Sequence, residues 1–103
     1  MNNMSEYQLR IYQIAPDRMA EFIAGWRNFV VPSRDEFGFK VVGAWIEAPA
    51  SEFVWLVRWD GPDGYAAADR DYYASPIRRA LSWDPVPLIM RHELRILSAV
   101  APR

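Results

Sequence analysis

The sequence contains no cysteine and only one histidine, His92. Without cysteine the chain has no disulfide, no thiol nucleophile and no thiolate metal ligand, and its composition fits a reducing compartment. One histidine without a carboxylate pair at ligand spacing does not make a convincing metal site in a single chain. We therefore expect a cytoplasmic protein with no metal and no bound cofactor.

An excess of one charge and a long apolar run are also missing. The formal net charge is −1, so the chain has no basic excess to attract nucleic acid or an anionic membrane surface. No apolar run approaches the roughly 18 residues that span a bilayer. Residues 1–5 lack the basic and apolar regions of a signal peptide. We expect a soluble protein that binds neither nucleic acid nor membranes.

Large apolar side chains are abundant instead. The 103 residues suit one small domain, and 51% of them are apolar and 15% aromatic, which is enough to build a core. Five tryptophans are more than so small a monomer easily buries, which favours a subunit interface or a ligand cavity. We expect one homodimeric domain over residues 6–98, with a disordered tail at 1–5 and a C-terminal tail at 99–103.

In the first half of the chain, the spacing of apolar residues changes from every second residue to every third or fourth. Residues 6–14 alternate in polarity, which predicts a half-buried strand. Apolar residues then recur at three- and four-residue spacing over 19–30, which predicts an amphipathic helix. Pro32 should kink or end this helix, leaving a ragged segment before Gly38. Residues 39–47 and 53–60 are rich in β-formers and predict a strand pair around a Pro-containing loop.

The second half repeats the helix and strand. Pro62 near a first helical turn predicts a helix that runs to about Tyr73, with Asp60 or Asp63 to cap it. Ser75 and Pro76 break this helix and cap a short second piece, residues 76–81. A stiff linker, 83–87, leads to a last strand, 88–97. The order βαββαβ predicts an α+β, ferredoxin-like, four-stranded antiparallel sheet with the first and third strands central and both helices on one face.

Four short motifs within residues 7–97 resemble one known family. They are Tyr7-Gln8-Leu9-Arg10-Ile11-Tyr12, Gly38-Phe39-Lys40-Val41-Val42-Gly43-Ala44-Trp45, Val57-Arg58-Trp59-Asp60 and Ile89-Met90-Arg91-His92-Glu93. Their order is similar to that of the NIPSNAP family. The resemblance implies a dimeric α/β barrel, in which the open sheet face packs on a second copy. It implies no single reaction, because related barrels include cofactor-free monooxygenases, haem-degrading enzymes, isomerases and members without an assigned activity.

Strand alternation selects the candidate ligand-binding residues. It places Leu9 and Ile11 towards the helices and one set of polar side chains on the open face. The candidates on this face are Arg10, Tyr12, Arg58, Arg91 and Glu93, and Arg95 lies beside them. Trp45 is a further candidate because it matches a family position. Guanidinium groups bind carboxylates in bidentate fashion, so one interpretation is a pocket for a small anionic or oxygen-rich ligand. The other is that Glu93 neutralises the arginines and the network only fixes the dimer register.

The remaining aromatic and polar residues predict structural roles. His92 should lie on the side of the last strand that carries Leu94 and Ile96, against the helices or at the sheet edge, as a structural histidine. Trp26, Trp55 and Trp59 should lie in the core, whereas Trp83 packs either over a barrel mouth or in an interface. The run from Asp69 to Tyr73 is typical of a solvated helix face. Neither predicted helix contains a histidine, which disfavours the haem-degrading chemistry of some related barrels.

Two functional hypotheses stay open at this level. In the first, the chain is a small-molecule-binding homodimer, with a cofactor-independent monooxygenase or isomerase as its enzymatic form. In the second, it is a non-enzymatic structural or interaction dimer. The sequence assigns no catalytic residue and does not decide whether the protein is an enzyme.

Overall fold

The computed structural model describes residues 5–102, and residues 1–4 and 103 of the two predicted tails lie outside this range. The elements are β1 (Glu6–Ile14), α1 (Met19–Gly25), η1 (Trp26–Val30), α2 (Val31–Phe37), β2 (Lys40–Glu47), β3 (Glu52–Trp59), α3 (Gly64–Ala74), α4 (Pro76–Arg79), η2 (Val86–Leu88) and β4 (Ile89–Leu97). The strands form one antiparallel sheet in the order β2-β3-β1-β4. This confirms the predicted ferredoxin-like order, with β1 and β3 in the centre.

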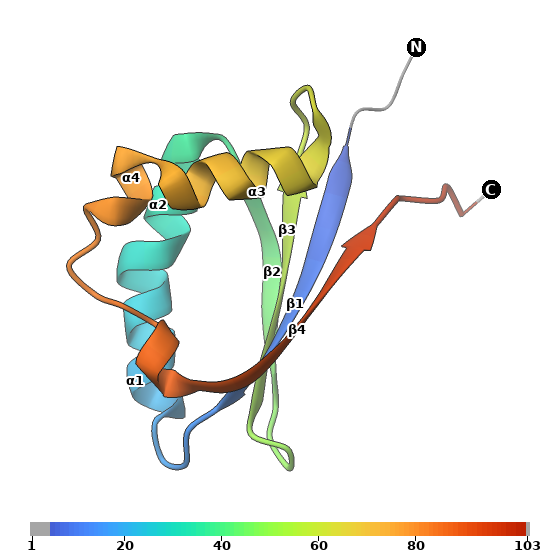
Figure 1. Cartoon of the computed structure of the whole chain (residues 1–103). Helices are drawn as coiled ribbons and strands as arrows, with labels where there is room; N and C mark the ends of the chain where they lie inside the picture. Colours follow the sequence, from blue (N-terminus) through green and yellow to red (C-terminus); the bar gives the residue numbers. More distant parts are fainter. Residues whose placement is uncertain (1–4, 103) are drawn as a thin grey trace.

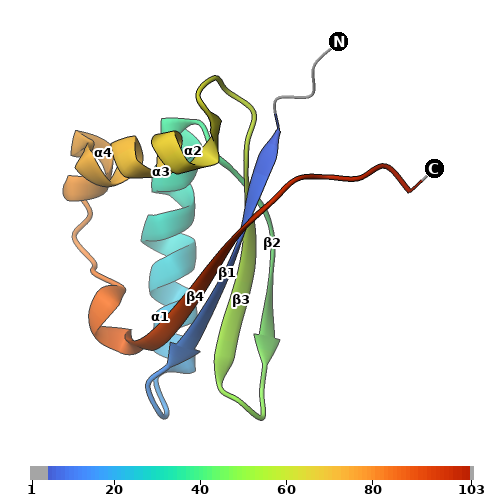
Figure 2. The same ribbon diagram turned by 45° about the vertical axis from the view of Figure 1, so that its right-hand side comes forward.

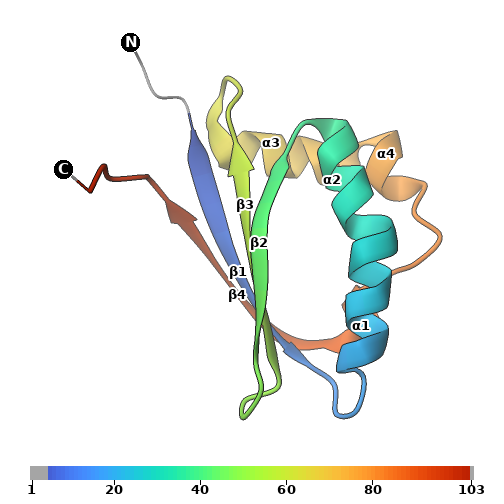
Figure 3. The same ribbon diagram turned by 180° about the vertical axis from the view of Figure 1, so that it is seen from behind.

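The molecule has two layers (Figure 1). Figures 2 and 3 show all the helices on one side of the sheet, with α3 and α4 beside the end of α2. Within residues 5–102, no helix covers the opposite face, which we call the open face. Every helix in this range is too short or too polar to cross a bilayer.

The first helix continues through Pro32, so the predicted end at Pro32 and the ragged segment after it are wrong. Residues Trp26–Val30 form a π-helical segment, in which the Val31 backbone N–H donates to the Trp26 carbonyl. A π turn just before Pro32 accommodates the hydrogen bond that proline cannot make. The helix ends at Gly38, whose φ of 118° suits glycine. The extra turns matter because they bury Ser33 and Arg34.

The caps of the later helices differ in part from the prediction. Asp63 precedes α3 without making a side-chain cap. The cap comes instead from Glu6 of β1, whose Oε1 accepts the Tyr65 backbone N–H at 2.7 Å. A carboxylate at this helix terminus also complements the helix dipole. Ser75 caps α4 as predicted, with its Oγ accepting the Arg78 backbone N–H at 3.3 Å.

Aromatic rings fill the space between the sheet and the helices. Trp26 contacts Phe53 edge-on at 4.9 Å between ring centroids and Trp55 at 5.6 Å. Trp59, half-buried at the end of β3, packs against Phe39 at 4.9 Å. These contacts confirm that the three tryptophans belong to the core. Aromatic pairs of this kind contribute about 0.5–1.5 kcal/mol each beyond the burial of their area.

Trp83 packs on the first helix. Its indole lies 5.9 Å from the ring of Phe22 and stacks at 6.3 Å on Phe29. A Cβ added to Gly25 would lie 2.2 Å from this indole. The absence of a side chain at Gly25 therefore lets the linker before β4 dock on α1.

We expect Gly25→Ala to destabilise the fold. Gly25 has helical φ and ψ, where alanine normally gains about 0.4–1 kcal/mol. Here the methyl group displaces Trp83, and overpacking of this kind costs about 1–3 kcal/mol. Urea unfolding measures the change. In a Trp83→Ala background the same substitution should become neutral or stabilising, and an equal loss in both backgrounds would exclude the contact as the cause.

Candidate functional site

Arg10 and Tyr12 face the helices, which corrects the prediction that they lie on the open face. Along β1, Gln8, Arg10, Tyr12 and Ile14 are buried, and the residues between them are only half-buried. The sheet register pairs Arg10 with Trp55 in the core. The prediction was wrong because it treated arginine as necessarily solvent-facing. Both sides of β1 carry large side chains, so polarity alone did not identify the buried side.

The other candidates lie on the open face as predicted, but they do not form one cluster with Arg10. Arg58 pairs with Asp60 at 3.0 Å, and Glu93 accepts from Arg95 Nε at 2.5 Å. Arg91 is opposite Gln13 in the register. Trp45 lies on the edge strand β2 and is 55% exposed. The predicted arginine cluster is thus divided between the two faces of the sheet.

Arg10 is at the centre of a buried polar cluster. Its Nε donates to the Tyr12 hydroxyl at 2.8 Å, and its NH2 donates to the Tyr73 hydroxyl at 3.0 Å. Its NH1 also donates to Gln8 Oε1. These contacts use all three guanidinium nitrogens and hold the side chain, which is 5% exposed, in one position. The Arg10 side chain is therefore held by partners on both β1 and α3.

Arg34 brings a second guanidinium group to the same place from α2. It donates to Asp69 Oδ1 at 2.6 Å and to the Tyr73 hydroxyl at 3.3 Å. Its guanidinium carbon lies 4.2 Å from the Tyr72 ring centroid. Cation–π contacts of this kind are strongest where water is excluded. Arg34 is 1% exposed, so α2, α3 and β1 meet at a nearly dry charged centre.

The two guanidinium groups share one carboxylate. Asp69 Oδ1 lies 2.6 Å from Arg34 NH1 and 3.8 Å from Arg10 NH1, and the cluster therefore keeps a surplus positive charge. Burial disfavours the charged form of Arg10, but Tyr12, Tyr73 and Asp69 outweigh it and raise the pKa of Arg10 above its usual value. Burial also raises the pKa of Tyr12, although Arg10 opposes this shift. Tyr12 is consequently a neutral phenol at neutral pH.

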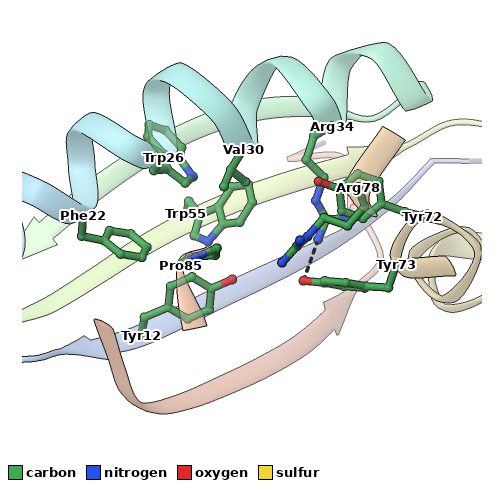
Figure 4. A pocket seen from close by; sticks show the side chains of 10 residues that line it. All are labelled: Tyr12, Phe22, Trp26, Val30, Arg34, Trp55, Tyr72, Tyr73, Arg78 and Pro85. Carbon is green, nitrogen blue, oxygen red and sulfur yellow. Dashed lines mark hydrogen bonds between the residues drawn. The ribbon is translucent and has the colours of Figure 1, made fainter. Parts of the chain in front are cut away.

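A small cavity adjoins this cluster inside the layer of aromatic rings (Figure 4). Its volume is about 20 Å³, which is room for roughly one water molecule. The side chains that line it come from β1, the first helix, β3, α3, α4 and the linker. They are Tyr12, Phe22, Trp26, Val30, Arg34, Trp55, Tyr72, Tyr73, Arg78 and Pro85.

A larger groove of about 240 Å³ lies on the other side of the same tyrosines, under β4. It shares Tyr12, Tyr73, Arg78 and Pro85 with the inner cavity. The rest of its lining is Arg10, Asp69, Val86, Ile89, His92 and Leu94. We call the inner cavity and this groove together the β4 pocket. Arg78 of α4 is half-buried there, with its guanidinium carbon 5.4 Å from the Tyr73 ring centroid.

His92 lies on the helix side of β4, as predicted, opposite Tyr12 in the register. It is exposed on the edge strand β4 and lines the groove, which agrees with the predicted alternative of a place at the sheet edge, and its structural role stays a prediction. Among residues 5–102, no three histidine or acidic side chains are grouped as metal ligands.

Among the charged and phenolic residues of the pocket, sequence reasoning did not single out Arg34, Asp69, Tyr73 or Arg78. The run from Asp69 to Tyr73 is solvated only in part, because Arg70 and Asp71 are exposed whereas Tyr72 is buried. A signal was present. Positions 65, 68 and 72 are buried at helical spacing, and positions 69 and 73 border this buried stripe. Asp69, an acidic residue beside this stripe, indicates that a buried cation lies opposite it.

Comparisons with known proteins show the family and the fold. The NIPSNAP family model matches residues 7–102. A search of curated proteins gives no significant match. An uncharacterised NIPSNAP domain protein from Burkholderia xenovorans is 19% identical, with a TM-score of 0.76 over 95% of this chain and 97% of that one. A NIPSNAP family protein from Agrobacterium tumefaciens is also 19% identical, with a TM-score of 0.80 over 100% and 92%.

A solved structure that does not carry the NIPSNAP name is similar as well. A putative antibiotic biosynthesis monooxygenase from Nitrosomonas europaea has a TM-score of 0.72 at 10% identity, over 99% of this chain and 96% of that one. At such identities the likeness shows the fold alone.

We expect Asp69→Asn to destabilise the protein by about 3–5 kcal/mol, because it leaves two buried guanidinium groups without a carboxylate. Urea unfolding measures the loss. Asp71→Asn is the matched control on the same helix, since Asp71 is exposed and pairs with the exposed Arg70 at 3.4 Å, and it should change stability by less than about 0.5 kcal/mol. Similar small losses for both variants would show that Asp69 is not the required counter-charge.

Proposed function

The chain belongs to the NIPSNAP family, and we propose that it binds a small anionic or oxygen-rich molecule in the β4 pocket. The observation that carries this proposal is the surplus buried positive charge beside an open groove. Arg10 and Arg34 share a single carboxylate, and Arg78 adds a third cation at the groove. A buried charge without a full complement of partners is costly, and an anionic ligand supplies the missing partner.

The open face is a weaker ligand site. Its hollow of about 360 Å³ is lined by Ile11, Gln13, Glu52, Arg91, His92 and Glu93. Glu93 there is already paired with Arg95, and Glu52 balances Arg91, so this hollow has no surplus positive charge to attract an anion. Arg58, a further cation of this face, is already paired with Asp60. The charge balance therefore favours the helix side of the sheet.

We also propose that the open face packs against a second copy of the chain. Its centre is apolar, with Leu9, Ile11, Val54 and Leu56 side by side in the register, and Trp45 lies exposed beside them. Charged groups such as Arg58, Arg91 and Glu93 surround this centre on the neighbouring positions. An apolar centre with a polar rim is the usual composition of a protein interface.

A ligand-binding test can use Arg78, which is half-buried and so tolerates replacement better than Arg10. Small carboxylates such as acetate, succinate and benzoate should bind and raise the melting temperature, whereas neutral amides should not. Calorimetry should show a loss of about tenfold or more in affinity for Arg78→Ala, which removes a charged hydrogen-bond donor. Arg79→Ala, on the exposed side of α4, should bind as the unmodified chain does. Absence of binding by every anion would refute the proposal.

The dimer proposal has its own test. Light scattering after size exclusion should give twice the chain mass for the unmodified protein and for Ala20→Glu, which lies on the exposed side of α1. Leu56→Glu places a charge at the centre of the apolar face and should give the mass of one chain. Circular dichroism checks that each variant is folded. A single-chain mass for the unmodified protein would contradict the proposal.

A further inference from the structure

Three buried N–H donors line the β4 pocket. Trp26 Nε1, Trp55 Nε1 and Arg34 Nε are buried and have no hydrogen-bond partner among the described residues. All three side chains line the inner cavity and converge on it with Tyr12 (Figure 4). Buried polar groups in native proteins are almost always paired, so three orphan donors around one cavity are unusual.

These groups can only donate. An indole N–H and a guanidinium have no acceptor lone pair in a protein. The two phenols of the pocket reinforce this character, because the hydroxyl oxygens of Tyr12 and Tyr73 already accept from Arg10 and their hydrogens are left to donate. The partner must therefore present acceptor atoms, and a carboxylate oxygen presents acceptors alone.

The groove outside the cavity has a different lining. Pro85, Val86, Ile89 and Leu94 form an apolar wall, and Val86 and Leu94 are 62% and 40% exposed. Exposed apolar side chains that line a groove favour an apolar ligand over water. The inner cavity has room for about one water molecule, whereas the groove, at about 240 Å³, is more than ten times larger.

We infer that the β4 pocket takes a small carboxylic acid with an apolar, one-ring body, and that Trp26 and Trp55 bind its head group through their indole N–H donors. One oxygen of the carboxylate occupies the inner cavity, and the ring lies in the groove between β4 and the linker. Arg10 and Arg34 supply the balancing charge. This inference rests on the proposed function and specifies the class of ligand.

Indole NMR signals test the inference directly. Each of the five tryptophans gives one Nε1–H signal, which its Trp→Phe variant assigns by removing it. The probe is cyclohexanecarboxylate, whose saturated ring causes no ring-current shift. We expect it to move the Trp26 and Trp55 signals downfield, as a new hydrogen bond does. The chemical shift of the Trp59 signal should not change, because this indole already donates to the Pro62 carbonyl at 3.2 Å.

Two further probes separate the parts of the ligand. Acetate carries the head group without the ring, and cyclohexylmethanol carries the ring without the charge. Both should bind at least tenfold more weakly than cyclohexanecarboxylate. Trp55→Phe keeps an aromatic ring but loses the donor, and its affinity for cyclohexanecarboxylate should fall by about tenfold. Trp59→Phe is the matched control and should bind normally.

The outcomes distinguish this inference from the proposed function. If no anion binds, both fail. If cyclohexanecarboxylate binds and Arg78→Ala weakens it while the Trp26 and Trp55 signals stay in place, the anion site is real and the indole contacts are refuted. If acetate binds as tightly as cyclohexanecarboxylate, the apolar ring is refuted. The NMR shifts are measured on the unmodified chain, and where Trp55→Phe does not fold the Trp55 signal is assigned by elimination from the other four variants, so the experiment remains decisive.

Discussion

The shared carboxylate of Asp69 is the interaction on which the rest of this structure depends. It accepts from Arg34 on α2 and lies 3.8 Å from Arg10 on β1, so one side chain of α3 joins both helices to the central strand. A buried guanidinium without a counter-charge would cost several kcal/mol. The two layers can therefore close in this arrangement only if all three elements are in place together.

Two backbone features follow from that requirement. The first is the π segment before Pro32, which lets the helix continue far enough to bring Arg34 under α3. The second is the cap that Glu6 gives to the first turn of α3, which fixes the start of that helix relative to β1. Each feature joins an element to the same charged centre. The aromatic rings then fill the space around the centre, and Arg34 lies against Phe39 and Tyr72.

The order of the elements was predictable from the sequence, because period and turn residues are local signals. The strand limits agree within one residue, and Ser75 capped α4 as expected. The candidate site was not predictable in the same way. The inward direction of Arg10 depends on Asp69, which is 59 residues away along the chain, and on phenol groups that polarity rules treat as ordinary core residues. A buried charge is visible in a sequence only when its partner is recognised at the same time. The charges of residues 69–73 suggested a solvated helix face, whereas the spacing of the apolar residues of α3 indicated that part of this segment is buried.

The position of Arg10 also changes the relation between ligand binding and association. Had the arginines all faced outward, a second copy and a ligand would compete for one surface. Instead, alternate residues of β1 belong to different surfaces, with Leu9 and Ile11 on the open face and Arg10 and Tyr12 in the β4 pocket. The proposed partner and the proposed ligand therefore occupy opposite sides of the same strand. Because a strand is stiff and its side chains share one backbone, packing on the open face and the position of Arg10 are mechanically joined through β1.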